Sequence, residues 1–175
     1  MFSTQSSNGC YTLIMFNLHE FATKEIIFME LKNREIKPYS INIADSKRTT
    51  KKAFIGFKTK EQMEDAFQKL QFAKILNLQI TCAYYLEPKE QNLYKVQLKN
   101  IPKNTDHKQI FYFWTQFGKI LSLTNFFDYE GQPQEQGVIQ FSSEKEVQNC
   151  LENYKQKIAE QPQLSQIEIE KYGKV

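Results

Sequence analysis

The 175-residue sequence lacks the features of a membrane-spanning, secreted or metal-binding protein. No apolar run approaches the ~20 residues that a membrane-spanning helix needs, which predicts a soluble chain with no membrane partner. The first ten residues have neither a basic nor an apolar segment, so they do not form a secretory signal. Cys10, Cys82 and Cys150 show no CxxC spacing, which indicates reduced thiols in a cytoplasmic or nuclear protein. Because His19 and His107 lie far apart without neighbouring cysteines, we expect no metal site.

Motifs of catalysis are also missing. The sequence has no Gly-rich phosphate loop, no HExxH and no GxSxG motif. Its Asp and Glu residues are scattered over expected helix faces, where solvation is their usual role. We therefore expect neither an enzyme nor a cofactor nor a small-molecule substrate.

Arginine is scarce, because only Arg34 and Arg48 are present among 23 basic residues. Contacts to phosphate would therefore depend mainly on lysine acting as a point charge. The net charge of +3 is too small to identify a nucleic-acid-binding protein. However, residues 1–90 carry 13 basic and 10 acidic groups, whereas residues 91–175 carry 10 of each. All the excess positive charge lies in the first half of the chain.

Two segments of the chain recur at nearly the same distance. Residues 13–18 (LIMFNL) are similar to residues 96–101 (VQLKNI), 83 positions later. Residues 51–57 (KKAFIGF) are similar to residues 135–141 (EQGVIQF), 84 positions later. Two pairs of similar segments with almost the same separation indicate a duplicated domain. The length and the 41% apolar content allow each copy a hydrophobic core of its own.

Each copy has the same expected order of elements. In the second copy Ile110, Trp114 and Phe117 follow a helical period after a candidate N-cap at Asp106. The order predicts an α+β fold with two ferredoxin-like βαββαβ domains in tandem, each a four-stranded antiparallel sheet with two helices on one face. The other face of each sheet would be open to a ligand. The expected elements are strands 12–17, 39–44, 51–57 and 78–85 with helix 61–70 in the first copy, and strands 94–99, 120–127, 135–141 and 165–170 with helices 109–117 and 144–154 in the second.

The recurring segments stand where the RNA recognition motif (RRM) family has its two signatures, RNP2 in the first strand and RNP1 in the third. Residues 50–57 keep the second and third aromatic positions of RNP1 and replace the first by Lys52. The chain therefore resembles a tandem RRM protein with degenerate RNP motifs.

Among tandem members the chain is similar to the first two motifs of poly(A)-binding proteins. The similarity lies in residues 17–19 (NLH), 117–122 (FGKILS) and 128–131 (DYEG), and in the length of the connection 86–92. Because such proteins have further domains, the sequence could be a fragment of a longer one. The predicted organisation is a flexible N-terminus at 1–11, RRM1 at 12–86, a short linker at 87–93 and a degenerate RRM2 at 94–173.

The family binds single-stranded RNA by stacking bases on aromatic rings of the two central strands, while basic groups follow the backbone. Strand alternation predicts that Leu13, Met15, Ala53, Ile55 and Phe57 lie in the core of RRM1. Ile14, Phe16, Lys52 and Phe54 would then lie on its open face. The resemblance and the alternation together predict RNA-binding residues of three kinds. The predicted stacking residues are Phe16 and Phe54, with Tyr84 or Tyr85. The residues predicted to bond base edges are Asn17 and Asn42, and those predicted to contact phosphates are Lys47, Arg48, Lys51 and Lys52.

RRM2 lacks more of the residues with which the family binds RNA. Its stacking positions are Gln97, Gln136 and Val138, Thr124 stands where the resemblance places a lysine, and Glu168 and Glu170 would repel phosphate. We expect a structural or protein-binding module. Candidates for protein contact are Phe111 and Tyr112, which exceed what the core face of helix 109–117 needs, and Phe126; core packing is the competing interpretation.

Three functional hypotheses follow. The leading one is binding of single-stranded RNA, A-rich or poly(A), mainly by RRM1, in mRNA metabolism in the cytoplasm or the nucleus, with RRM2 supporting it or binding protein. The alternative is that both RRMs are protein–protein interaction modules in a larger ribonucleoprotein or regulatory complex. A third is binding of single-stranded DNA, which differs from RNA by the 2′-hydroxyl.

Overall fold

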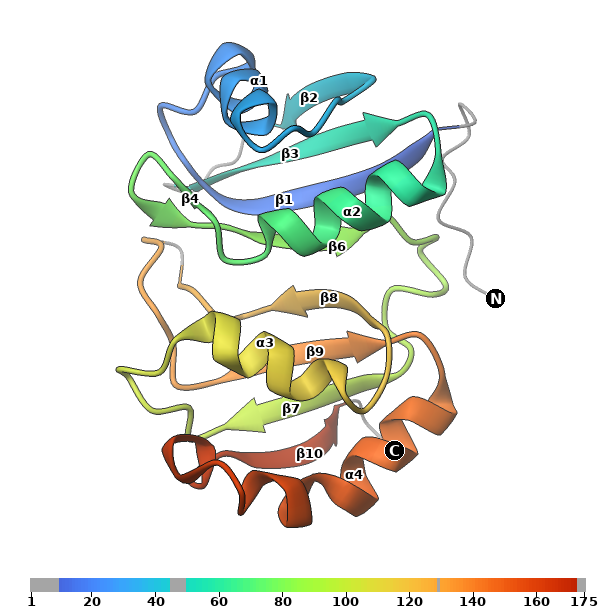
Figure 1. Cartoon of the computed structure of the whole chain (residues 1–175), viewed down its shortest axis with the longest axis vertical. Coiled ribbons are helices and arrows are strands. Elements are labelled where there is room, and N and C mark those ends of the chain that lie inside the picture. Colours follow the sequence, from blue (N-terminus) through green and yellow to red (C-terminus); the bar gives the residue numbers. More distant parts are fainter. Residues whose placement is uncertain (1–9, 45–49, 129, 173–175) are drawn as a thin grey trace. The chain divides into compact units, whose positions relative to one another are not determined.

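A computed structural model of the chain describes residues 10–44, 50–128 and 130–172 (Figure 1). The chain divides into two compact units, the first ending at Glu87 and the second starting at Pro88, except that residues 130–132 group with the first. Each unit is described by itself. The domain boundaries 12–86 and 94–173 stay predictions, and most of the expected flexible N-terminus lies outside the described residues.

The first unit is a four-stranded antiparallel sheet in the order β6-β1-β3-β2. Both of its helices cover one face of that sheet (Figure 1). The strand expected at 78–85 is divided, because Leu76 and Asn77 adopt positive φ and form a small separate hairpin. The elements are β1 (Tyr11–His19), α1 (Lys24–Asn33), β2 (Ser40–Ala44), β3 (Thr50–Phe57), α2 (Lys60–Leu70), the hairpin strands β4 (Lys74–Ile75) and β5 (Leu78–Gln79), and β6 (Thr81–Tyr84).

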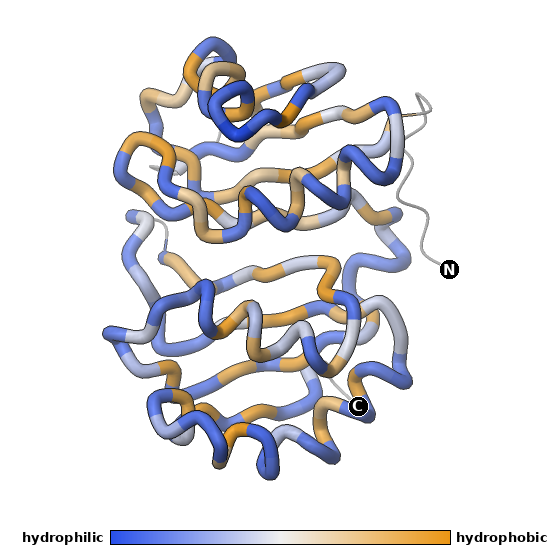
Figure 2. The backbone as a smooth tube through the Cα atoms, in the orientation of Figure 1, coloured by the Kyte–Doolittle hydropathy of each residue, from blue (hydrophilic) through white to orange (hydrophobic). Residues whose placement is uncertain are grey.

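The core of the first unit follows from the helical and strand periods of its sequence. Thr59 caps α2 by accepting a hydrogen bond from the backbone N–H of Gln62 at 3.3 Å. Figure 2 shows mostly hydrophilic residues along α2 and hydrophobic ones concentrated in the strands. The helix buries one stripe against the sheet, and the five strand residues predicted for the core are fully buried, which confirms that prediction.

The second unit repeats the arrangement with the strand order β10-β7-β9-β8. The predicted N-cap at Asp106 is confirmed, since its side chain accepts from the N–H of Lys108 at 2.9 Å. The second strand is shorter than expected, because Asn125 takes a φ of 62° and ends it. The elements are β7 (Lys95–Lys99), α3 (His107–Thr115), β8 (Ile120–Thr124), β9 (Gly137–Phe141), α4 (Glu144–Ile158), the 3-10 turn η1 (Pro162–Leu164) and β10 (Glu168–Tyr172).

Two aromatic side chains of the second unit are not exposed as expected. Phe111 is buried because His107, Ile110, Phe111 and Trp114 form one stripe at spacings of three and four residues. Phe126 is buried as well, and its ring lies so close to Gly137 that a Cβ there would approach the ring to 2.5 Å. The expectation that these rings serve as protein contacts is therefore wrong. Tyr112 remains exposed on α3.

Within the described residues, no helix is both long and apolar enough to cross a bilayer.

Candidate nucleic-acid interface

The open face of the first unit carries the residues that alternation assigned to it. In the register of the sheet, Phe54 of β3 lies between Ile14 of β1 and Asn42 of β2. Ile14, Phe16 and Phe54 are half-buried and Lys52 is exposed. Both helices of the unit lie over the opposite face of the sheet (Figure 1).

A hollow of about 450 Å³ lies on this face. Its aromatic lining consists of Phe54, Tyr85 and Tyr39. Asn42 and Ser40, both from the edge strand β2, add a carboxamide and a hydroxyl. Aromatic walls with a few placed polar groups are typical of ligand sites of this size.

The structure distinguishes between the two tyrosines at the end of the last strand. The backbone N–H of Tyr85 donates to the carbonyl of Thr12 at 2.9 Å, and the Tyr85 ring lines the hollow. Tyr84 instead points into the core, where its ring stacks on Phe67 of α2 with the centroids 4.5 Å apart. Burial raises the pKa of the Tyr84 hydroxyl. Of the two alternatives that the sequence left open, Tyr84 is buried in the core, and Tyr85 is the one that lines the open face.

Lysine side chains lie over two of the rings on this face. The Nζ atom of Lys52 is 5.7 Å from the centroid of Phe54. The Nζ atom of Lys58, just after β3, is 5.5 Å from the centroid of Tyr39. These cation–π contacts hold positive charge beside surfaces on which bases could stack. Lys51 also lies on β3 and is half-buried, whereas Lys47 and Arg48 fall outside the described residues.

Asn17 does not face the open surface as a base-reading residue should. It has a φ of 61°, a left-handed conformation that asparagine tolerates better than most residues. Its buried Nδ2 donates to the backbone carbonyl of Gln79 at 2.7 Å. The pairing of β1 with β3 shifts register at this point. Asn17 therefore shapes the end of β1, and the prediction that it contacts bases is wrong.

The open face of the second unit has few aromatic rings. Gln97 pairs with Val138 on one side and with Glu170 on the other, so non-aromatic residues occupy its centre. The expected repulsion of phosphate by Glu170 is weaker than its charge suggests, because Lys99 forms an ion pair with it at 2.6 Å. Tyr172 on the edge strand β10 was not predicted as part of this face; its ring lies 5.8 Å from the Nζ atom of Lys95.

Residues 90–93, which belong to the second unit and fall in the linker predicted at 87–93, cover part of this second face. The buried Nε2 of Gln140 donates to the carbonyls of Glu90 at 2.8 Å and of Leu93 at 3.0 Å. Its Oε1 accepts from the hydroxyl of Ser122 at 3.2 Å. Nearby, the Nζ atom of Lys95 donates to the Asn92 side chain, and burial lowers the pKa of this lysine. The linker thus packs on the surface where a strand of RNA would have to lie.

Replacing Gln140 by alanine is expected to loosen this contact. The change removes two hydrogen bonds to the linker and leaves the Ser122 hydroxyl without its acceptor. Each such loss at a buried site costs about 0.5–1.5 kcal/mol. Urea unfolding should show a free energy of unfolding lowered by about 1.5–4.5 kcal/mol. Gln136→Ala, at an exposed glutamine just before β9, is the control, and an equal loss there would contradict the assignment.

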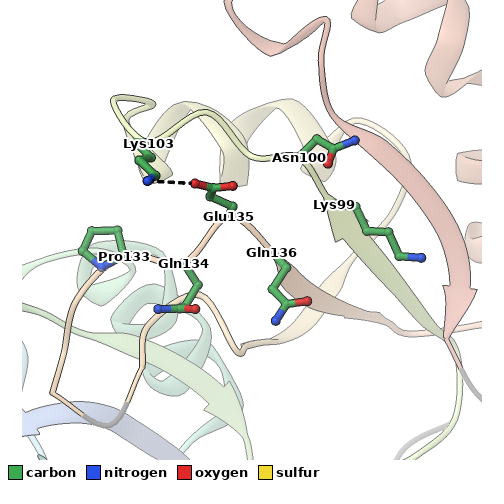
Figure 3. Close-up of a pocket in the computed structure, with 7 residues that line it drawn as sticks. All are labelled: Lys99, Asn100, Lys103, Pro133, Gln134, Glu135 and Gln136. Atoms are coloured by element: carbon green, nitrogen blue, oxygen red, sulfur yellow. Dashed lines mark ion pairs between the residues drawn. The ribbon is translucent and has the colours of Figure 1, made fainter.

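A second hollow, of about 540 Å³, lies beside the end of β7 (Figure 3). Amides from Asn100, Gln134 and Gln136 line it. On one side of it, Lys103 forms an ion pair with Glu135 at 3.1 Å. No aromatic residue lines this hollow, so it offers no surface for stacking a base. The hollow of the first unit is therefore the better candidate for binding nucleic acid.

Reactive side chains have little part in either face. The thiols of Cys82 and Cys150 are buried, and burial raises the pKa of Cys150 to about 12. No group of three or more His, Cys, Asp or Glu side chains within the described residues is placed to hold a metal ion.

The order of the elements and the pairing of the strands define the fold of each unit. Each unit has the βαββαβ order, with two helices on one face of an antiparallel sheet, which is the α+β fold of an RRM in two copies. The family model of the RNA recognition motif matches residues 96–164, in the second unit. No curated protein matches the sequence.

Solved structures show the same fold. The RNA binding domain of Hrp1 in complex with RNA has a TM-score of 0.52 at 16% identity, over 93% of this chain and 96% of that one. A chain of the rna15, hrp1 and anchor RNA 3′ processing ternary complex has a TM-score of 0.52 at 16% identity, over 81% and 86%. Domains 1 and 2 of Sex-lethal from Drosophila melanogaster align over 92% and 99%, with 16% identity and a TM-score of 0.41. At 16% identity the first two similarities support the fold alone. The third has a TM-score below 0.5 and adds no argument.

Proposed function

We propose that the chain is a non-enzymatic RNA-binding protein that binds single-stranded RNA through the open face of its first unit. One observation carries the proposal: Phe54, Tyr85 and Tyr39 line a single hollow on that face. Aromatic rings beside lysines match single-stranded nucleic acid, because bases stack on the rings while the amines neutralise phosphates. Lys52 and Lys58 supply those amines.

The finer parts of the proposal rest on the sequence. Its similarity to the first two motifs of poly(A)-binding proteins suggests A-rich RNA as the ligand and mRNA metabolism, in the cytoplasm or the nucleus, as the setting. Asn42 is compatible with this preference, since a carboxamide can form two hydrogen bonds with adenine. Phe16, Lys47, Arg48 and Lys51 complete the proposed contacts.

The second unit would support this binding or contact a protein. Its face lacks stacking residues at the centre, and the linker occupies one end of it. The exposed Tyr112 on α3 is the remaining candidate for a protein contact.

The alternative is that both units are protein–protein interaction modules in a larger ribonucleoprotein or regulatory complex. The covered face of the second unit favours it for that unit. The hollow of the first unit favours nucleic acid, and single-stranded DNA would use the same stacking contacts. Partners that survive nuclease treatment and are lost with Tyr112→Ala would support the protein alternative.

A titration of the full chain tests the proposal. Fluorescently labelled A-rich and U-rich oligonucleotides, each as RNA and as DNA, would be titrated at two salt concentrations. We expect saturable binding that weakens as salt rises, because lysine–phosphate contacts release counterions. Tighter binding to A-rich RNA would support the preference. Absence of binding at low salt would overturn the proposed function.

A further inference from the structure

The outer side of α1 carries large apolar side chains. Residues 26–29 of this helix (IIFM) form a continuous apolar run (Figure 2). Ile27 and Leu31 are fully buried in the core of the first unit, whereas 48% of the surface of Phe28 and 53% of that of Met29 are exposed. A helix at the surface of a domain usually has a polar outer face. The helix α1 therefore has more apolar surface than the packing of its own unit uses.

The helix α2 of the same unit has the usual arrangement. Its buried residues form one stripe, and all of its exposed residues are charged or carry an amide. On this outer side Lys69 forms an ion pair with Asp65 at 2.9 Å. Both helices cover the same face of the sheet (Figure 1). The exposed apolar surface is therefore particular to α1.

Four exposed residues of α1 form one stripe, because residues three, four and seven positions apart lie on the same side of a helix. They are Glu25, Phe28, Met29 and Lys32. Glu25 lies in the first turn and Lys32 in the last. Hydrogen bonds with its own backbone and with Thr23 lower the pKa of Glu25, so its carboxylate is charged at neutral pH. The stripe thus has an apolar centre with a negative charge at one end and a positive charge at the other.

This stripe is complementary to a second copy of itself. Glu25 and Lys32 lie at equal distances from the midpoint between Phe28 and Met29, about 5 Å to either side along the axis at ~1.5 Å per residue. When two α1 helices pack antiparallel, Glu25 of each copy is level with Lys32 of the other. Phe28 of each is then level with Met29 of the other, and a thioether against a ring is a favourable contact. A dimer with twofold symmetry needs a surface of this self-complementary kind.

We propose that the stripe of Glu25, Phe28, Met29 and Lys32 is a dimerisation surface on which α1 of a second copy packs antiparallel. Phe28 and Met29 supply the apolar contact, and the two glutamate–lysine pairs fix the orientation. One pair of short helices buries less than the ~1,200–2,000 Å² of a stable interface, so the dissociation constant should be roughly 10–100 μM. Because α1 covers the face opposite to the open one, each open face keeps its affinity for a short oligonucleotide (Figure 1). The inference does not depend on the proposed function.

Two charge reversals in the full chain test the pairing. Sedimentation equilibrium would measure dimerisation from tenfold below to tenfold above the expected dissociation constant. Glu25→Lys and Lys32→Glu should each raise that constant at least fivefold, since both attractive pairs become repulsive. An equimolar mixture of the two variants should dimerise as well as the unchanged chain. In the mixture one stripe has two lysines and the other two glutamates, so every pair is attractive again. Recovery in the mixture also shows that both variants are folded.

Glu61→Lys on α2 is the matched control. Glu61 lies in the first turn of that helix behind the cap Thr59, and hydrogen bonds of the same kind lower its pKa. The control should dimerise like the unchanged chain, and an equal loss there would refute the surface on α1. An unchanged chain that stays monomeric at every concentration overturns the proposal. A mixture that dimerises no better than its separate components would refute the antiparallel pairing, and RNA binding by the open face would be unaffected by any of these results.

Discussion

Replacing Phe54 by alanine is expected to weaken RNA binding by the full chain by about 1–3 kcal/mol, a loss of roughly 5- to 150-fold in affinity. Phe54 lies at the centre of the open face, where it pairs with Ile14 and Asn42, and it lines the hollow. The change removes a stacking surface, and Lys52 loses the ring beneath it. Fluorescence anisotropy with an A-rich oligonucleotide measures the effect.

Phe28→Ala is the control for this experiment. Phe28 belongs to the same unit but lies on α1, and 48% of its surface is exposed. Its loss should leave the affinity within twofold of the unchanged chain. Equal weakening by the two variants would show that the rings act through stability or a different surface. The salt dependence should be retained in Phe54→Ala, because the lysines remain.

The fold could be predicted because its information is repeated in the sequence. The period of the helices, the alternation of the strands and the two copies at one offset each lead to the same order of elements. The alternation also placed Leu13 in the core and Phe54 on the open face correctly. Such periodic signals remain intact even when an element shifts by one or two residues.

The candidate site was harder to predict because its decisive residues lie where the periods end. Tyr39 precedes β2 and Lys58 follows β3, so neither belongs to a strand pattern. The hairpin β4–β5 interrupts the last strand, so counting along the sequence could not decide between Tyr84 and Tyr85. Asn17 follows the start of a register shift. Each of these positions depends on local backbone geometry that alternation does not describe.

The contact made by the linker could not be predicted from the sequence for a different reason. Glu90 and Leu93 take part through their backbone carbonyls, so their side chains give no sign of the contact. Gln140 looks like an ordinary polar residue of a strand, yet it is buried and bonded three times. The open faces of the two units therefore differ in two ways. The face of the second unit lacks aromatic residues at its centre, and the linker covers part of it.

Replacing Trp114 by alanine is expected to destabilise the second unit strongly while RNA binding by the first persists. The indole is fully buried, and the rings of Phe113 and Phe117 lie 4.9 Å and 5.5 Å from it. Truncation of a buried tryptophan costs about 3–5 kcal/mol. A domain is commonly stable by only ~5–15 kcal/mol, so a substantial part of the stability of this unit would be lost.

Thermal unfolding followed by circular dichroism should show one transition moved to lower temperature, since Trp114 contributes to one of two separate cores. Affinity for the A-rich oligonucleotide, measured below both transitions and again between them, should stay within about threefold of the unchanged chain. Tyr112→Ala, on the exposed side of the same helix, should leave both transitions in place. A loss of affinity that parallels the unfolding of the second unit would contradict the assignment of RNA binding to the first. The linker would then act as a cover that RNA displaces, because the face beneath it would have to contribute to binding.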